Sequence, residues 1–266
     1  MTTLTLTKHH GLGNDFLVVF HPGVADVSGL AQQLCDRRTG IGADGLLVAE
    51  SEPERAARMV LFNADGSRAE MSGNGIRCFA QALAARRGDL SDQLIATDAG
   101  DRLVALIATD DPHVVHASVD MGEVEERAAP SGWSQLGTHP DRPVVHLGVG
   151  NPHSVVGVDD VRAVDLLALG RQIPSVNLEI IEPGPEPHAI TMRVHERGAG
   201  ITTSCGTGAV AAAVAARRWG LVNGEVDEID VHMDGGAAKV ILDRPSPGRA
   251  MLSGPSTYVA TIEVPL

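Results

Sequence analysis

Two similar stretches of sequence lie half a chain length apart, and they constrain the fold more than any other feature. Residues 72–75 (SGNG) are followed by IRCFAQALAARRG, and residues 205–208 (CGTG), 133 positions later in a chain of 266, are followed by AVAAAVAARRWG. Each stretch reads as a small residue of nucleophile type, a Gly-x-Gly turn and an Ala-rich helix. Such a repeat predicts two similar halves with matched helix N-termini and one site between them. One half supplies the thiol of Cys205, whereas the other supplies only the hydroxyl of Ser72.

The composition is that of a globular protein with an aliphatic core. Hydrophobic residues make up 43% of the chain but aromatic residues only 3%, so the core must consist mainly of Val, Leu, Ile and Ala. The net charge of −13 argues against a nucleic-acid-binding protein, whose surface is basic. We also expect no signal peptide and no membrane partner, because long apolar stretches are missing. Cys35, Cys78 and Cys205 form no CxxC pair, which predicts a cytoplasmic protein without a zinc site.

The sequence also argues against a bound cofactor. Lys8 and Lys239 are the only lysines, and neither lies in the Gly/Ser-rich context of a pyridoxal phosphate site. A P-loop motif is missing, and residues 11–13 (GLG) lack the remainder of a dinucleotide fingerprint. We therefore expect chemistry carried by side chains alone, with no cofactor and no metal.

Alternating apolar patterns predict strands around each of the two helices. The helical segments FAQALAA and AVAAAVAA have little polar face, which indicates burial on most sides inside a mixed or antiparallel sheet. A short helix is predicted at 30–38, and the strand pattern restarts near residues 120–122. The predicted fold is α+β, with two pseudo-symmetric domains that each wrap a mostly antiparallel sheet around a central apolar helix. The predicted domains span residues 1–118 and 119–255, and the strand at about 256–266 is a candidate to return to the first.

Cys205 and Ser72 each have a structural and a chemical interpretation. A free cysteine is commonly a small buried hydrophobe, and serine is a preferred helix N-cap. At a helix N-terminus, however, the helix dipole lowers the pKa of a thiol toward neutrality, so that Cys205 could exchange protons with a substrate. The N–H groups that follow Cys205 could bind an anion. Ser72 would then face the opposite side of the same α-carbon.

Other polar residues also have two interpretations. A single asparagine in a Gly-rich context is commonly a turn residue, whereas several that converge would form a neutral cage for a zwitterion. The Glu196-Arg197 pair could lie on the surface or bind an amine and a carboxylate. His153 could belong to a turn or orient the thiol. The asparagines in question are Asn14, Asn63, Asn74, Asn151 and Asn177.

Taken together, these motifs resemble the diaminopimelate epimerase family of cofactor-independent epimerases. The segments that carry the resemblance are GLGNDF (11–16), RRTGIGADG (37–45), FNADGSRAEMSGNGIRC (62–78), GNPHSVV (150–156), VNLE (176–179) and ERGAGITTSCGTGA (196–209). The resemblance implies two α/β halves with the active site in the cleft between them, and interconversion of LL- and meso-diaminopimelate for lysine and cell-wall synthesis. It implies Cys205 as a catalytic acid/base opposite position 72, with His153 and Glu196 near the catalytic pair. The implied substrate-binding groups are Asn14, Asn63, Asn151, Asn177, Glu196, Arg197 and the backbone N–H groups of Gly73, Asn74, Gly206 and Thr207.

The chain departs from the family pattern at a few positions. The family usually has cysteine where this chain has Ser72, and Cys78 matches a second, non-catalytic cysteine. Ile201 stands where the family often has glutamate, and Gly45 where some members have glutamine. Ser72 is therefore open to three interpretations: an engineered change, a natural serine assisted by a base such as His153 or serving a different substrate, or the mark of a weak binder.

The alternatives to diaminopimelate epimerisation are a racemase or isomerase of another amino acid and a catalytically weak amino-acid-binding protein. In each case the expected partner is a small amino-acid substrate. An exposed apolar sheet edge would support a homodimer.

Overall fold

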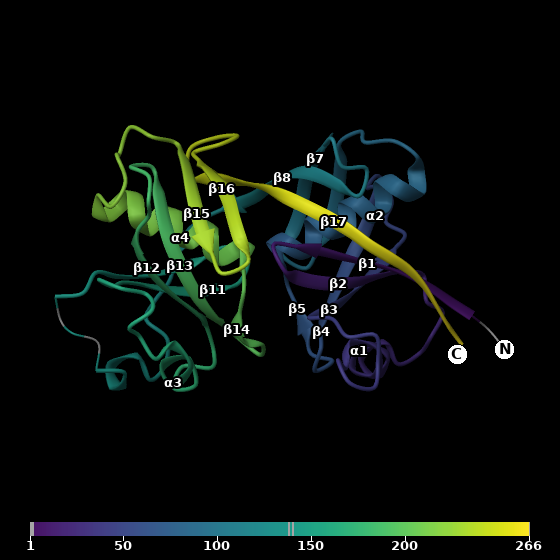
Figure 1. Cartoon of the computed structure of the whole chain (residues 1–266), viewed down its shortest axis with the longest axis horizontal. Coiled ribbons are helices and arrows are strands. Elements are labelled where there is room, and N and C mark those ends of the chain that lie inside the picture. Colours follow the sequence, from purple (N-terminus) through teal and green to yellow (C-terminus); the bar gives the residue numbers. More distant parts are fainter. Residues whose placement is uncertain (1–2, 138, 140, 266) are drawn as a thin grey trace. The chain divides into compact units, whose positions relative to one another are not determined.

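The computed structural model describes residues 3–137, 139 and 141–265. The chain divides into two compact units, an N-terminal unit of Met1–Val119 with Gly254–Leu266 and a C-terminal unit of Asp120–Ser253. The predicted domain ends at residues 1 and 266 lie outside the described residues. The last strand, β17 (Arg249–Pro265), begins in the C-terminal unit and continues in the N-terminal unit (Figure 1).

The N-terminal unit is a closed ring of strands. Antiparallel ladders join β17 to β1, β1 to β2, β3 to β4, β6 to β7 and β7 to β8, and β17 also pairs with β8. Parallel ladders join β2 to β3 and β4 to β6, and the short β5 pairs with β4. The strand bounds are β1 Thr3–Gly11, β2 Asn14–Phe20, β3 Gly45–Glu50, β4 Ala57–Asn63, β5 Arg68–Ala69, β6 Gln93–Thr97, β7 Gly100–Ala108 and β8 Val114–Glu123.

Helix α2 (Gly73–Arg87) occupies the centre of this ring (Figure 1). Every residue from Gly73 to Ala84 is buried, as expected for an Ala-rich helix without a polar face. The helix ends at Gly88, whose left-handed conformation closes the last turn. A second layer lies outside the ring, where α1 (Val27–Cys35) packs Leu30 and Leu34 against the outer side chains of β3.

The C-terminal unit repeats this arrangement. Parallel ladders join β11 to β12 and β13 to β15, and antiparallel ladders join β9 to β10, β10 to β11, β12 to β13, β13 to β14, β15 to β16 and β16 to β17. Helix α4 (Gly206–Trp219) is the buried central helix, and α3 (Leu166–Gly170) is the outer one. The remaining bounds are β9 Glu125–Glu126, η1 Trp133–Gln135, β10 Val144–Gly148, β11 Pro152–Gly157, β12 Asn177–Pro183, β13 Ala189–Glu196, β14 Gly200–Thr202, β15 Glu228–Met233 and β16 Gly236–Leu242.

These observations confirm the predicted fold class of two similar, mostly antiparallel units with a buried helix in each. Among the described residues, no helix combines the length and the apolar character needed to cross a membrane.

Strand register defines which residues of the two units are equivalent. Phe16 pairs with Gly45, and Gly45 pairs with Asn63. His153 likewise pairs with Asn177, and the pairing of Leu178 with His195 puts Glu196 beside Asn177. Together with the alignment of Ser72 on Cys205, the ladders give these equivalent pairs: His9 and Leu147, Asn14 and Asn151, Phe16 and His153, Gly45 and Asn177, Leu47 and Glu179, Asn63 and Glu196, Asn74 and Thr207, Gly75 and Gly208, Arg77 and Val210.

Candidate active site

Ser72 and Cys205 are the N-caps of the two central helices. Both residues have extended backbone, with φ −138° and ψ 123° for Ser72 and φ −132° and ψ 115° for Cys205. The Ser72 Oγ accepts a hydrogen bond from the Gly75 N–H at 3.0 Å, and the Cys205 Sγ accepts one from the Gly208 N–H at 3.4 Å. The first N–H groups of each helix have no acceptor within the helix, so both N-termini can receive an anion.

Glycine at the fourth position of each motif permits a close approach of strand and cap. A Cβ atom at Gly208 would lie 2.7 Å from the Glu179 Oε1 and 3.2 Å from the Cys205 Sγ. A Cβ atom at Gly75 would lie 3.0 Å from the Ser72 Cβ and 3.4 Å from the Leu47 Cδ2. Equivalent strands therefore approach equivalent caps, but one presents a carboxylate and the other an aliphatic side chain.

The thiol of Cys205 lies among carboxylates. Cys205 is only 4% exposed, and its Sγ is 3.5 Å from the Thr207 Oγ1. The Glu196 carboxylate lies near enough to the thiol for its negative charge to raise the thiol pKa, and it accepts a hydrogen bond from the Thr202 hydroxyl. Glu196 can therefore take up the thiol proton.

The pKa of Cys205 is raised, so the expectation of a thiol poised near neutrality is wrong for this structure. Burial raises the pKa well above the ordinary thiol value, and the negative charges of Glu196 and Glu179 raise it further. Hydrogen bonds from Thr207 and Gly208 oppose the shift but do not reverse it. Burial also raises the pKa of Glu196, and Glu179 adds to that effect. The helix dipole is therefore outweighed by burial and by two nearby carboxyl groups.

A buried hydrogen bond between His153 and Glu179 lies close to the thiol. The His153 Nδ1 is 2.7 Å from the Glu179 Oε1, and both side chains are inaccessible to solvent. The His153 Nε2 is 2.7 Å from the Asn151 Oδ1. Both ring nitrogens thus face oxygen atoms. The second carboxylate oxygen of Glu179 has no hydrogen-bond partner among the described residues.

Asn177 links the end of β13 to the first residue of β11. Its Oδ1 accepts a hydrogen bond from the Arg197 N–H at 2.8 Å, and its Nδ2 donates to the Pro152 carbonyl at 3.2 Å. The C-terminal unit thus brings together the predicted residues Asn151, His153, Asn177, Glu196, Arg197, Cys205, Gly206 and Thr207.

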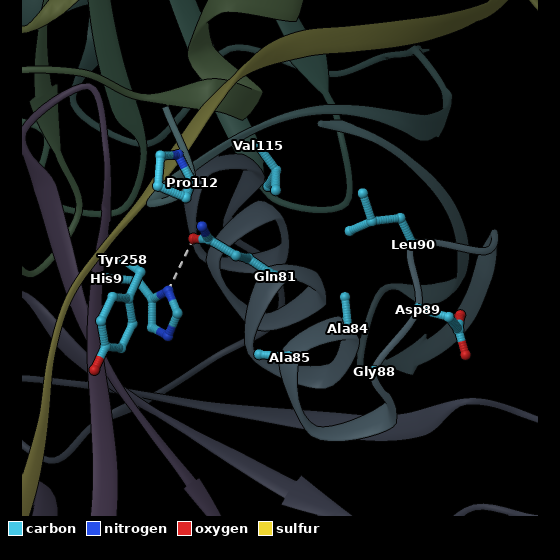
Figure 2. Close-up of a pocket in the computed structure, with 10 residues that line it drawn as sticks. All are labelled: His9, Gln81, Ala84, Ala85, Gly88, Asp89, Leu90, Pro112, Val115 and Tyr258. Atoms are coloured by element: carbon cyan, nitrogen blue, oxygen red, sulfur yellow. Dashed lines mark hydrogen bonds between the residues drawn. The ribbon is translucent and has the colours of Figure 1, made fainter. Parts of the chain in front are cut away.

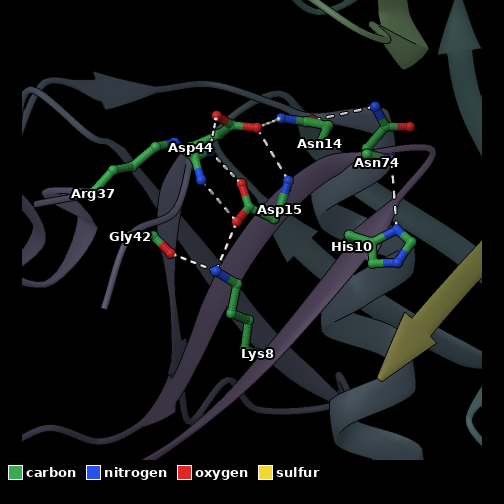
Figure 3. A network of polar contacts seen from close by, with 9 residues as sticks. Lys8, His10, Asn14, Asp15, Arg37, Gly42, Asp44 and Asn74 are labelled. Carbon is green, nitrogen blue, oxygen red and sulfur yellow. Dashed lines mark hydrogen bonds and ion pairs between the residues drawn. The ribbon is translucent and has the colours of Figure 1, made fainter. Parts of the chain in front are cut away.

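In the N-terminal unit, Asn14 and Asn74, which follows Ser72 by two residues, belong to a polar network (Figure 3). Asn74 donates to the Asn14 Oδ1 at 3.2 Å, and Asn14 donates to the Asp44 Oδ2 at 2.7 Å. Asp44 is in turn held by Arg37 at 2.7 Å. This network fixes the orientation of the Asn14 amide.

Other predicted residues of the N-terminal unit lie outside that network. The Asn63 Nδ2 donates to the Ser67 Oγ at 3.0 Å in the turn after β4. Among the described contacts of Ser72, none involves a titratable side chain. Cys78 is completely buried within α2, and burial raises its pKa to about 12. It cannot replace the missing thiol at position 72.

A separate cavity of about 440 Å³ lies at the opposite, C-terminal end of α2 (Figure 2). His9 and Tyr258 line it, and the His9 Nδ1 donates a hydrogen bond to the Gln81 Oε1 at 2.9 Å. Burial lowers the pKa of His9 to about 4, so this ring is neutral at physiological pH. The lining contains none of the predicted site residues.

Glu179, Arg77 and Asp44 were not among the site residues predicted from the sequence. Glu179 lies two residues after Asn177 on a strand, so both side chains point to the same face. That alternation was a usable signal for Glu179. No comparable signal exists for Arg77, because arginine within an Ala-rich helix usually lies on a solvated face.

Comparison with known proteins identifies the family. The sequence profile described as Diaminopimelate epimerase matches residues 6–126 and 145–259. The chain belongs to the diaminopimelate epimerase family. Among members of this isomerase family, the diaminopimelate epimerase of Pelotomaculum thermopropionicum is 36% identical over 97% of this chain and 98% of the relative. That of Geobacillus kaustophilus is 33% identical, and the match covers 98% of this chain and 96% of the relative.

Solved structures support the family fold over the whole chain. A phenazine biosynthesis protein of the PhzF family from Bacillus anthracis superposes with a TM-score of 0.76 at 16% identity, covering 100% of both chains. A hydroxyproline epimerase from Agrobacterium vitis superposes with a TM-score of 0.70 at 14% identity, covering 99% of this chain and 91% of the other. Within the family fold, the described residues contain no cluster of three or more metal-ligating side chains.

Proposed function

We propose that this protein epimerises LL-diaminopimelate to meso-diaminopimelate by direct proton transfer at the α-carbon, without a cofactor. The observation that carries the proposal is the Cys205 thiol at the N-terminus of α4, with the Glu196 carboxylate as a neighbouring charge. Relatives that match nearly the whole chain are named diaminopimelate epimerase, which supports the choice of substrate.

In the proposed mechanism, Cys205 removes the α-hydrogen as a thiolate. Glu196 accepts the thiol proton first, and the ammonium group of the substrate offsets the negative charge that otherwise raises the thiol pKa. The N–H groups of Gly206 and Thr207 bind the substrate carboxylate. Because negative charge builds up on that carboxylate as the proton leaves, these donors stabilise the carbanion more than the ground state.

The second proton transfer is assigned to Ser72, with the Gly73 and Asn74 N–H groups as further carboxylate donors. A hydroxyl is a far weaker acid than a thiol, whose ordinary pKa is about 8.5. We therefore propose that protonation from the Ser72 side limits the rate of inversion. The remaining polar groups of the substrate are assigned to Asn14, Asn63, Asn151, Asn177, Glu196 and Arg197. His153 is assigned to orienting the Asn151 amide and the Glu179 carboxylate near the thiol.

A second candidate function is binding of an amino acid without turnover. It is favoured by one observation, namely that the described contacts of Ser72 include no group that could activate its hydroxyl. For either function we propose a cytoplasmic protein, since all three cysteines are free and buried. We also propose that the protein forms a homodimer.

Deuterium incorporation in heavy water distinguishes the two candidate functions. Incubation of the protein with meso-diaminopimelate in heavy water should place deuterium at the α-carbon, as read by mass spectrometry. The Cys205→Ala variant should lose this exchange by at least about a thousandfold, because general acid–base catalysis commonly contributes factors of that order. Exchange that persists in the variant would overturn the mechanism. Tight binding by calorimetry without exchange would establish the binding protein instead.

A further inference from the structure

Arg77 is a buried cation of the N-terminal unit that has no counter-charge among the described residues. Its side chain is 0% exposed, and its Nε and Nη1 have no hydrogen-bond partner within that part of the chain. Its only described hydrogen bond runs from Nη2 to the Asn74 Oδ1, at 2.6 Å. No described carboxylate forms an ion pair with Arg77. Asp15 and Asp44 instead pair with Arg37, and Asp15 also pairs with Lys8. Burial lowers the pKa of Arg77 only to about 10, so the group is charged at neutral pH.

The charge of Arg77 lies close to the N-terminus of α2. Side chains on a helix point back toward its N-terminus, and Arg77 reaches the side chain of the second helical residue, Asn74. Two glycines make room for the guanidinium. A Cβ at Gly11 would lie 3.1 Å from Nη2, and a Cβ at Gly254 would lie 3.2 Å from Cζ. The strands around the ring are therefore shaped to accept a cation at this place.

Fold stability does not account for this cation. A buried charge without a partner destabilises a folded protein, and replacing it by an apolar group of similar size is often neutral or stabilising. The equivalent residue of the C-terminal unit is Val210, which is completely buried in the same kind of helix. The same helix position in this fold thus works without a charge. A group that costs stability in one unit and is dispensable in the other points to function.

We infer that Arg77 is a positioning residue that strengthens carboxylate binding at the N-terminus of α2. It adds a buried positive charge to the partial positive charge of the helix end, and it orients Asn74 through the Asn74 Oδ1. The inference rests on the proposed function, in which the Gly73 and Asn74 N–H groups bind the substrate carboxylate. Because the charge is buried, its effect is screened little by salt.

The test compares Arg77→Met with Arg86→Met in a Cys205→Ala background, so that ligand binds without turnover. Arg86 lies on the same helix but in its last turn and exposed to solvent, so both variants lose one arginine charge. Calorimetry would measure the dissociation constants of meso-diaminopimelate and of its α-carboxamide. Arg77→Met should weaken binding of the carboxylate by at least about tenfold, with little change for the carboxamide and the same result at high salt. Arg86→Met should bind both ligands as before, and Arg77→Lys should restore part of the carboxylate preference.

Thermal unfolding separates this role from a structural one. Arg77→Met should unfold at the same or a higher temperature than its parent, since an unpaired charge has been removed. Equal weakening of both ligands, or a marked loss of stability with an unchanged carboxylate preference, would overturn the inference. Failure of the Cys205→Ala parent to bind diaminopimelate, or failure of the unsubstituted protein to catalyse exchange, would instead refute the proposed function, and the thermal comparison would still report on Arg77.

Discussion

The two units of this protein share a strand order, a helix cap and a buried helix, yet their buried charges differ. In the C-terminal unit, Glu196, Glu179 and His153 surround the thiol of Cys205. In the N-terminal unit, Phe16 and Leu47 take the places of His153 and Glu179, whereas the cation Arg77 stands where the C-terminal unit has Val210. The duplicated scaffold therefore supplies two capped helix N-termini, but among the described residues only the Cys205 cap has titratable side chains next to it. Exchanging residues between equivalent positions tests this difference.

The largest effect is expected when the helix N-cap of the N-terminal unit is replaced by the residue that caps the helix of the C-terminal unit. Ser72→Cys replaces a hydroxyl by a far more acidic thiol, so kcat for epimerisation should rise by about a hundredfold. Circular dichroism or a coupled assay for meso-diaminopimelate would measure it. The double variant Ser72→Cys with Cys205→Ala serves as the control and should stay inactive. An unchanged kcat in Ser72→Cys would show that serine already performs the transfer at full rate.

A smaller effect is expected when Glu179 of the C-terminal unit is replaced by leucine, the residue at the equivalent position 47 of the N-terminal unit. Glu179→Leu removes a negative charge that raises the pKa of Cys205, so the ascending limb of the kcat–pH profile should move to lower pH. The value of kcat should fall by about tenfold or more because His153 loses its buried partner. Glu179→Gln should show the same pH shift with a smaller loss of kcat.

The matched control is Leu47→Met, a change at the equivalent position of the N-terminal unit. It should leave the pH profile of the parent unchanged, since Leu47 carries no charge. If Glu179→Leu keeps the parent's pH profile, the coupling between Glu179 and the thiol is refuted.

The smallest effect concerns stability and compares His9 with its equivalent, Leu147. The folded-state pKa of His9 is about 4, against an ordinary value of 6.5, so the unfolded chain binds the proton first as the pH falls. The free energy of unfolding should therefore fall by about 2 to 3 kcal/mol between pH 7 and pH 4.5 through this residue. Urea titrations at both pH values should show a smaller loss for His9→Leu than for the parent. Equal losses would refute the assignment.

Much of the scaffold could be predicted from the sequence, because the repeat fixes the spacing of the helices and their apolar faces require a surrounding sheet. The helix predicted at 30–38 instead spans Val27–Cys35, because Asp26 caps its start by accepting the Gly29 N–H. After the helix, Asp36 accepts the N–H groups of Arg38 and Thr39 in a turn.

The chemistry of the site was less accessible from sequence. The direction of the Cys205 pKa shift depends on burial and on two carboxylates that come from different strands, whereas the helix end alone was visible in the sequence. Glu179 and Arg77 become recognisable only when strand register and burial show that one unit has charges where the other has aliphatic or aromatic side chains.

The most direct test of the account compares exchange with inversion for each stereoisomer in heavy water. For the stereoisomer whose α-hydrogen is removed by Cys205, deuterium should enter the recovered substrate faster than the substrate is inverted, because the carbanion is reprotonated by Cys205 more readily than by Ser72. In the Ser72→Cys variant, the rate of inversion should approach the rate of deuterium exchange. Equal rates of exchange and inversion for both stereoisomers in the parent protein would contradict the claim that proton transfer from Ser72 is slower than proton transfer from Cys205.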